Sequence, residues 1–149
     1  MSEFLYFAAP LFSIAELQFN LQIVSRIEES VRVFLPQRDG GLIVNLVSEG
    51  MNFERAAQQI ASIDLNAIRN CAGVVAILDG PSIDEGVAFE IGYAHAIGKC
   101  CVALATDPRR SSLGFCNPMV RSALADVCES EEALLSEIRT RFVPVRGDA

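Results

Sequence analysis

The chain has 149 residues, of which 51% are hydrophobic and 21% charged. This length is enough to bury a hydrophobic core without disulfides or metal ions to stabilise it, so we expect one domain over residues 1–149. A net charge of −7, with no basic cluster larger than Arg109-Arg110, argues against nucleic acid as a partner and favours small-molecule ligands. The apolar excess predicts that some surface is buried between subunits of a homo-oligomer.

Cysteine usage and the first residues predict the compartment. The 5 cysteines are an odd number without CxxC spacing, which is typical of reduced, cytoplasmic proteins. The N-terminal residues lack a basic region, and no apolar run reaches about 18 residues, so we expect neither a signal peptide nor a membrane span. A cytoplasmic protein without a membrane partner is therefore predicted.

The first elements are easily read. An apolar run over residues 5–9 predicts a buried strand, which a proline ends. Ser13 and Glu16 stand at capping-box spacing before apolar residues at helical period, so a helix is expected over residues 13–29. A second strand is expected over residues 31–35.

The next part is the least regular. Asp39-Gly40-Gly41 predicts a turn, and residues 42–47 fit either a strand or a helical turn. Residues 52–70 have a helical pattern that allows one helix or two pieces.

A βαβ unit occupies the centre of the chain, with strands over residues 74–78 and 100–105 and a helix over residues 84–98. Glu90 is the only formal charge within residues 86–98. A solvent-facing helix would carry several charges, so we expect this helix to be covered on most sides and take Glu90 as the candidate for the chemistry.

The end of the chain predicts a loop over residues 107–117, a short helix over 118–124 and an amphipathic helix over 130–142. Strands that alternate with helices indicate an α/β fold, a single flavodoxin-like (Rossmann-like) domain whose parallel sheet of about five strands has helices on both faces. Ligands of such sheets bind beyond the carboxyl ends of the strands, where Asp84 and Glu90 fall.

Asp84 and Glu90 suggest a two-carboxylate site. Six positions along a helix rotate by about 600°, so the two side chains converge only if Asp84 lies on the loop and folds back. The helix N-terminus would favour an ionised Glu90, while a shielded Asp84 could hold a proton. One nucleophile and one acid is the pattern of retaining glycosyl transfer.

Each candidate also has a structural interpretation. Asp84 could be only a helix cap, and Glu90 only a structural carboxylate bonded to Tyr6 or to the backbone. His95 is better explained as a packed or partly exposed histidine, because no cluster with metal-ligand spacing surrounds it. No GxGxxG, P-loop, GxSxG or HExxH motif is present, so we expect no metal and no cofactor.

The run DEGVAFEIGYAHAIGK, with YFAAPLF near the start and IDLNAIRNCAGVVAILDG between them, closely resembles the nucleoside 2-deoxyribosyltransferases. The resemblance extends from Tyr6 to about Phe142. It implies an enzyme of nucleoside metabolism and salvage that moves a 2-deoxyribosyl group between nucleobases through a covalent deoxyribosyl-Glu90 intermediate, or hydrolyses the bond to free base and deoxyribose. By the same resemblance, Asp84 protonates the leaving base and Tyr6 orients the nucleophile.

The resemblance also implies which residues bind the substrate. Asp64 would contact the nucleobase, Phe12 would close over it, and Gly86 belongs to the same set. Asn117 and Met119 resemble an Asn-x-Met segment that the adjoining subunit of a dimer or hexamer supplies to bind the sugar hydroxyl.

Two alternatives stay open. The 2′-deoxynucleoside 5′-monophosphate N-glycosidases resemble this chain in fold and catalytic Glu, but a Ser/Gly/Arg-rich loop holds their phosphate, whereas residues 8–12 here contain no cation. A non-catalytic nucleotide-sensing domain would have a similar shape. Residues 35–41 depart from the family's base-contacting pattern, so the base preference is not predicted.

Overall fold

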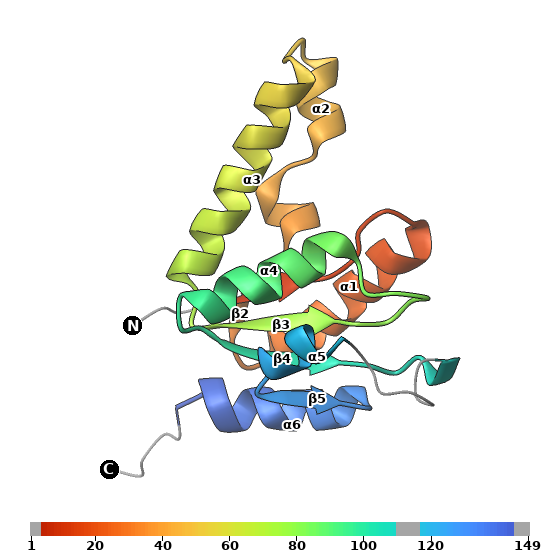
Figure 1. The fold of residues 1–149 in the computed structure, drawn as a ribbon, viewed down its shortest axis with the longest axis vertical. Coiled ribbons are helices and arrows are strands. Elements are labelled where there is room, and N and C mark those ends of the chain that lie inside the picture. The colour runs from red at the N-terminus through yellow and green to blue at the C-terminus, as the bar shows by residue number, and fades with distance from the viewer. Residues whose placement is uncertain (1–3, 110–116, 145–149) are drawn as a thin grey trace.

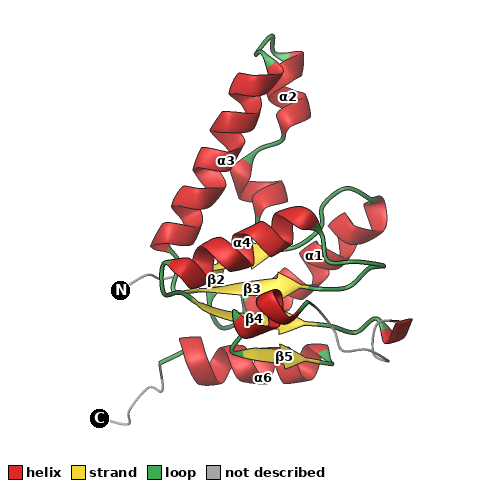
Figure 2. Cartoon of the chain, in the orientation of Figure 1, coloured by secondary structure: helices red, strands yellow, loops and turns green. Residues whose placement is uncertain are grey.

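The computed structural model describes residues 4–109 and 117–144. Its centre is one sheet of five parallel strands in the order β2-β1-β3-β4-β5 (Figure 2). The strands are β1 (Phe4–Ala8), β2 (Arg32–Phe34), β3 (Gly73–Ile77), β4 (Cys100–Leu104) and β5 (Asp126–Cys128). The predicted α/β fold with a parallel sheet is therefore confirmed.

Helices cover both faces of this sheet (Figure 1). They are α1 (Ile14–Ile27), α2 (Ile43–Ser48), α3 (Phe53–Asn70), α4 (Glu85–Ala96), α5 (Pro118–Ser122) and α6 (Glu131–Phe142), with a π-helical turn η1 (Pro36–Gly40) after β2. The buried residues of α1 and α6 share one apolar cluster with one face of the strands, and those of α3 and α4 share a second cluster with the other face.

Alternation along β1 decides which side chain faces which layer. Leu5 and Phe7 pack towards α1 and α6, whereas Tyr6 and Ala8 pack towards α3 and α4. Both layers are buried, so β1 is apolar throughout except for the phenol of Tyr6. That hydroxyl must find its partner among the side chains of α3 and α4.

Most predicted elements are present within a few residues of their expected bounds. The segment 42–47, which fitted a strand or a helical turn, begins helix α2 with Leu42 as its N-cap, and the segment 52–70 is the single helix α3 with Asn52 as its N-cap. Strand β5 was not predicted, because three residues that include an aspartate are too few to show an alternating pattern. The expected loop over residues 107–117 lies partly outside the described residues.

The expectation that α4 is covered on most sides is wrong for the single chain. Val87, Ile91 and Ala94 face the sheet, but Phe89 on the outer side is 63% exposed. The low charge of α4 is therefore not explained by its burial in this fold.

Helix α2 and the adjoining part of α3 project from the body of the molecule (Figure 1). No helix in the described parts of the chain is long and apolar enough to cross a membrane.

Candidate active site

The side chains of Tyr6 and Glu90 meet between β1 and α4. The Tyr6 hydroxyl donates a hydrogen bond to Glu90 Oε1 at 2.5 Å. Phe34, the register partner of Tyr6 on β2, stacks on the tyrosine ring at 5.6 Å between centroids, so the phenol has little freedom to turn away. Both interpretations of Glu90, as a structural carboxylate and as an oriented nucleophile, predict this hydrogen bond.

The protonation of Glu90 differs from the sequence-based expectation. The pKa of Glu90 is raised to about 8, mainly by burial; the Tyr6 hydrogen bond acts in the opposite direction, and the charges of Asp64 and Asp84 contribute to the rise. The expected help from the helix N-terminus is absent because Glu90 lies beyond the first turn of α4, where the helix dipole has faded. An ionised Glu90 was therefore the wrong expectation for the free protein at neutral pH.

Tyr6 stays a hydrogen-bond donor. Burial, followed by the charges of Glu90 and Asp64, raises the pKa of Tyr6 far above its ordinary value. The phenol is consequently protonated at any pH at which the protein works, and it stabilises the ionised form of Glu90 more than the neutral form.

Asp84 is the N-cap residue of α4, as predicted. Its Oδ2 accepts a hydrogen bond from the Val87 backbone N–H at 3.0 Å, so the side chain folds back over the first turn. A Cβ at Gly86 would lie 3.0 Å from the same oxygen, so a larger residue there would crowd the carboxylate. Asp84 is confirmed as the helix cap, and its charge also acts on Glu90, so the two carboxylates lie near each other.

Asp64 is not the ordinary surface acid that its neighbours in the sequence suggest. Its Oδ1 is buried and is the one such side-chain N or O atom without a hydrogen-bond partner among the described residues. Burial raises the pKa of Asp64 to about 6, and its charge acts on both Tyr6 and Glu90. A buried polar atom without a partner is uncommon in folded proteins, so a ligand group is an obvious partner for it.

The structure does not bring the remaining candidates to this site within one chain. Phe12, in the loop after β1, is 78% exposed, and Met119 in α5 is 79% exposed. Asn117 is the N-cap of α5 and accepts a hydrogen bond from the Met119 N–H at 2.8 Å, with Pro118 at the favourable first helical position. His95 is exposed, and no group of three His, Cys, Asp or Glu residues in the described ranges could hold a metal ion.

Two contacts of this site were missed by the sequence analysis. Phe34 on the Tyr6 ring and Gly40 beside Asp64 both come from the segment around β2, whose register against β1 no sequence pattern reveals.

Comparison with known proteins adds a family to this geometry. The model of a family described as nucleoside 2-deoxyribosyltransferase matches residues 5–135, which include Tyr6, Asp64, Asp84 and Glu90. The chain belongs to the nucleoside 2-deoxyribosyltransferase family. The resemblance found in the sequence is thereby confirmed, and a search of curated proteins gave no match.

Three solved structures of other proteins are similar to this chain in fold. A conserved protein from Enterococcus faecalis V583 is 32% identical, with a TM-score of 0.80 over 95% of this chain and 100% of that chain. A 2-deoxyribosyltransferase from the psychrotolerant bacterium Bacillus psychrosaccharolyticus is 20% identical, with a TM-score of 0.69 over 89% of this chain and 90% of that chain. A 2-desoxiribosyltransferase from Leishmania mexicana is 21% identical, with a TM-score of 0.70 over 95% and 99%. The last two likenesses concern the fold alone.

Proposed function

We propose that this protein transfers a 2-deoxyribosyl group between nucleobases, with Glu90 as the nucleophile. The observation that carries the proposal is the partly buried Glu90 carboxyl held by the Tyr6 hydroxyl, with Asp64 and Asp84 close enough to act on its charge. Because Tyr6 occupies Oε1, the second oxygen of Glu90 is the one that we assign to attack on the sugar.

The reaction balances with the residues of this site. The Glu90 carboxyl passes its proton to Asp84 and forms a bond to C1′ of a deoxynucleoside while the bond from C1′ to the base nitrogen breaks, and the leaving base takes the bonding electrons and the proton from Asp84. A second base then attacks C1′ and releases Glu90 while its proton returns to Asp84, or water does the same in hydrolysis. Positive charge develops on the sugar in the transition state. This charge favours the ionised form of Glu90, whose pKa is about 8 in the free protein.

Deoxynucleosides fit this site better than their 5′-monophosphates. The loop after β1, residues 8–12, carries no cation and little that could replace the hydration of a phosphate. A non-catalytic sensing domain is also disfavoured, because two neighbouring, partly buried carboxyls with raised pKa values, Asp64 and Glu90, destabilise a fold and are typical of catalytic sites.

We further propose that a second subunit completes the pocket. Phe89 presents a large apolar surface on the outer side of α4, and an interface there would account for the low charge of this helix. Asn117 and Met119, both exposed on α5 next to α4, would reach the sugar of the neighbouring site, and Phe12 would close over the base.

Incubation with deoxyinosine, with and without adenine, tests the reaction. Chromatography is expected to show hypoxanthine and deoxyadenosine when adenine is present, and hypoxanthine with free deoxyribose when water is the acceptor. Glu90→Ala is expected to fold, as circular dichroism would show, and to lose turnover by several orders of magnitude. If the wild-type protein forms neither product, with purine or with pyrimidine deoxynucleosides, this result would contradict the proposal.

A further inference from the structure

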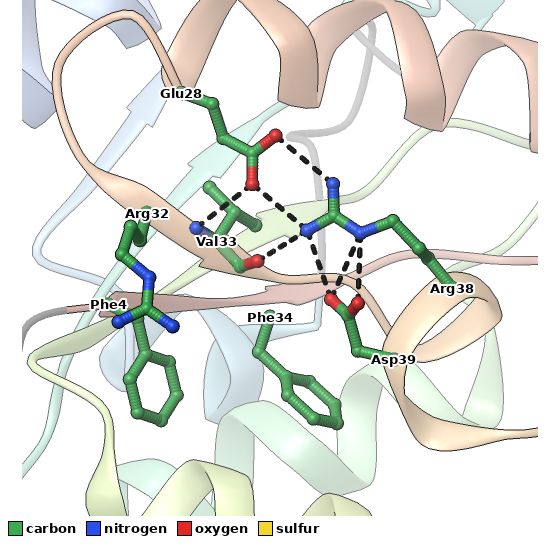
Figure 3. A pocket seen from close by; sticks show the side chains of 7 residues that line it. All are labelled: Phe4, Glu28, Arg32, Val33, Phe34, Arg38 and Asp39. Carbon is green, nitrogen blue, oxygen red and sulfur yellow. Dashed lines mark hydrogen bonds and ion pairs between the residues drawn. The ribbon is translucent and has the colours of Figure 1, made fainter.

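The turn η1 is held against the edge of the sheet by an ionic network that we call the Arg38 clasp, made of Arg38, Glu28 and Asp39 (Figure 3). The Arg38 guanidinium donates to both oxygens of Glu28 at 3.1 and 2.9 Å, and its Nε donates to Asp39 at 3.0 Å. Arg38 Nη2 also donates to the carbonyl oxygen of Val33 at 2.7 Å, on the edge strand β2.

The clasp fixes the backbone as well as the side chains. Asp39 Oδ2 accepts a hydrogen bond from the Leu35 N–H at 2.8 Å, at the junction of β2 and η1. Glu28, at the end of α1, accepts from the Val33 N–H at 3.4 Å. Three segments are therefore joined by charge-assisted bonds, which constrain the turn more than a single surface ion pair would.

A second bridge holds η1 from the side of α1. Asn20, only 1% exposed, donates through Nδ2 to the carbonyl oxygen of Pro10 at 2.9 Å and to Gln37 Oε1 at 2.8 Å. Gln37 in turn donates to the carbonyl oxygen of Leu17 at 3.0 Å. The turn is thus fixed on two sides, so its last residue, Gly40, has a well-defined position.

Gly40 is the residue of η1 that touches the site. A Cβ at this position would lie 2.8 Å from Asp64 Oδ1, whereas the next atom, on the Phe34 ring, is 3.7 Å away. The φ angle of Gly40 is not positive, so what requires glycine here is space for the Asp64 carboxyl rather than backbone conformation. Asp64 Oδ1 has no hydrogen-bond partner among the described residues, so the residues packed beside it, Gly40 among them, limit its position by their bulk alone.

We propose that the Arg38 clasp positions the Asp64 carboxyl through Gly40, and that Arg38 is therefore a positioning residue for recognition of the nucleobase. The inference rests on the proposed function, in which Asp64 contacts the base. It predicts that weakening the clasp acts on base binding and does so only while Asp64 is present.

The test is a double-mutant cycle of Arg38→Ala and Asp64→Ala, with steady-state kinetics of base exchange at saturating deoxynucleoside. Arg38→Ala is expected to raise KM for the acceptor base about tenfold, the equivalent of one hydrogen bond, and to change kcat by less than about threefold. In the Asp64→Ala background the same substitution is expected to change KM by less than about twofold.

Arg26→Ala is the matched control. The exposed side-chain fraction of Arg26, 36%, is close to the 39% of Arg38. Arg26 forms ion pairs with Glu131 and Glu132, and these pairs join α1 to α6 on the face of the sheet opposite α3. KM for the base is expected to be unchanged in this variant. A tenfold rise in KM for Arg38→Ala that persists without Asp64 would overturn the positioning role.

Glu28→Gln removes the charge that Arg38 pairs with and so weakens the clasp at its other end, and it replaces Arg38→Ala in the cycle if that variant fails to fold. Crystal structures of the two variants provide a readout that needs no activity: the Asp64 carboxyl is expected to move relative to residue 40. An Asp64 carboxyl that stays in its wild-type position would overturn the positioning role. Absence of base exchange in the wild-type protein, by contrast, would overturn the proposed function and leave this structural result to decide the inference.

Discussion

The hydrogen bond from Tyr6 to Glu90 can be removed with almost no change of shape. The hydroxyl lies 2.5 Å from Glu90 Oε1, and the ring is fully buried and stacked on Phe34. Tyr6→Phe keeps the ring and its packing, so the variant isolates the effect of one hydrogen bond on the carboxyl of Glu90.

The size of the effect follows from the influences on Glu90. Its pKa is raised from 4.5 to about 8, mainly by burial, even though the hydrogen bond lowers it by stabilising the ionised form. A hydrogen bond to a charged group contributes about 1.5–3 kcal/mol, and about 1.4 kcal/mol corresponds to one pKa unit. The pKa of Glu90 should therefore rise to about 9 or 10 in the variant, and the ionised fraction at pH 7 should fall about 10- to 100-fold.

The assay is kcat/KM between about pH 5 and about pH 10 for a deoxynucleoside whose leaving base needs no proton from Asp84, since this ratio then reports the ionisation of Glu90 in the free enzyme. The wild-type rate is expected to rise with pH through about 8, and the Tyr6→Phe rate through about 9 or 10, with the two curves converging at high pH. Tyr93→Phe is the control, because the Tyr93 ring stacks on Phe89 and lies under Arg69 on the surface of α4 and α3.

A Tyr6→Phe enzyme with the wild-type midpoint and the same loss at every pH would refute the reasoning, because the hydroxyl would then not act through the ionisation of Glu90. A wild-type rate that is already maximal at about pH 5 would show that Glu90 is ionised in the free enzyme, as the helix-dipole argument alone had predicted.

Three further predictions concern the same carboxylates. Glu90→Gln should raise the free energy of unfolding by about 3 kcal/mol at pH 7, because the pKa of Glu90 is raised from 4.5 to about 8 on folding and the wild-type protein loses stability as pH rises between these values. Urea unfolding should show no difference in stability between the two proteins below about pH 4.5. Asp84→Asn should slow cleavage most for natural bases and least for deoxynucleosides with better leaving groups, whereas a uniform loss would indicate a cap alone. Mixing inactive Glu90→Ala and Asn117→Ala subunits should restore activity if each site is built from two subunits. If the mixture stays inactive although mass spectrometry shows that subunits have exchanged, the shared arrangement is excluded.

Local patterns determined most of the elements and the identity of the candidate residues. The capping box at Ser13 and Glu16 begins α1, and Asp84 caps α4, because these hydrogen bonds involve residues only three positions apart. The motif around Glu90 was also readable, since a lone carboxylate in an apolar helix stands out in the sequence. The three-residue strand β5 was beyond this reach because it is too short to show a period.

Only the tertiary structure decided the electrostatics of the site. Tyr6 and Glu90 are 84 positions apart, and their hydrogen bond exists because β1 and α4 pack with the phenol facing the helix. The raised pKa of Glu90 and the partnerless oxygen of Asp64 depend on burial by segments distant in the chain, including the turn that carries Gly40. Burial and long-range charge set the protonation of a carboxyl, and neither is encoded in the spacing of neighbouring residues.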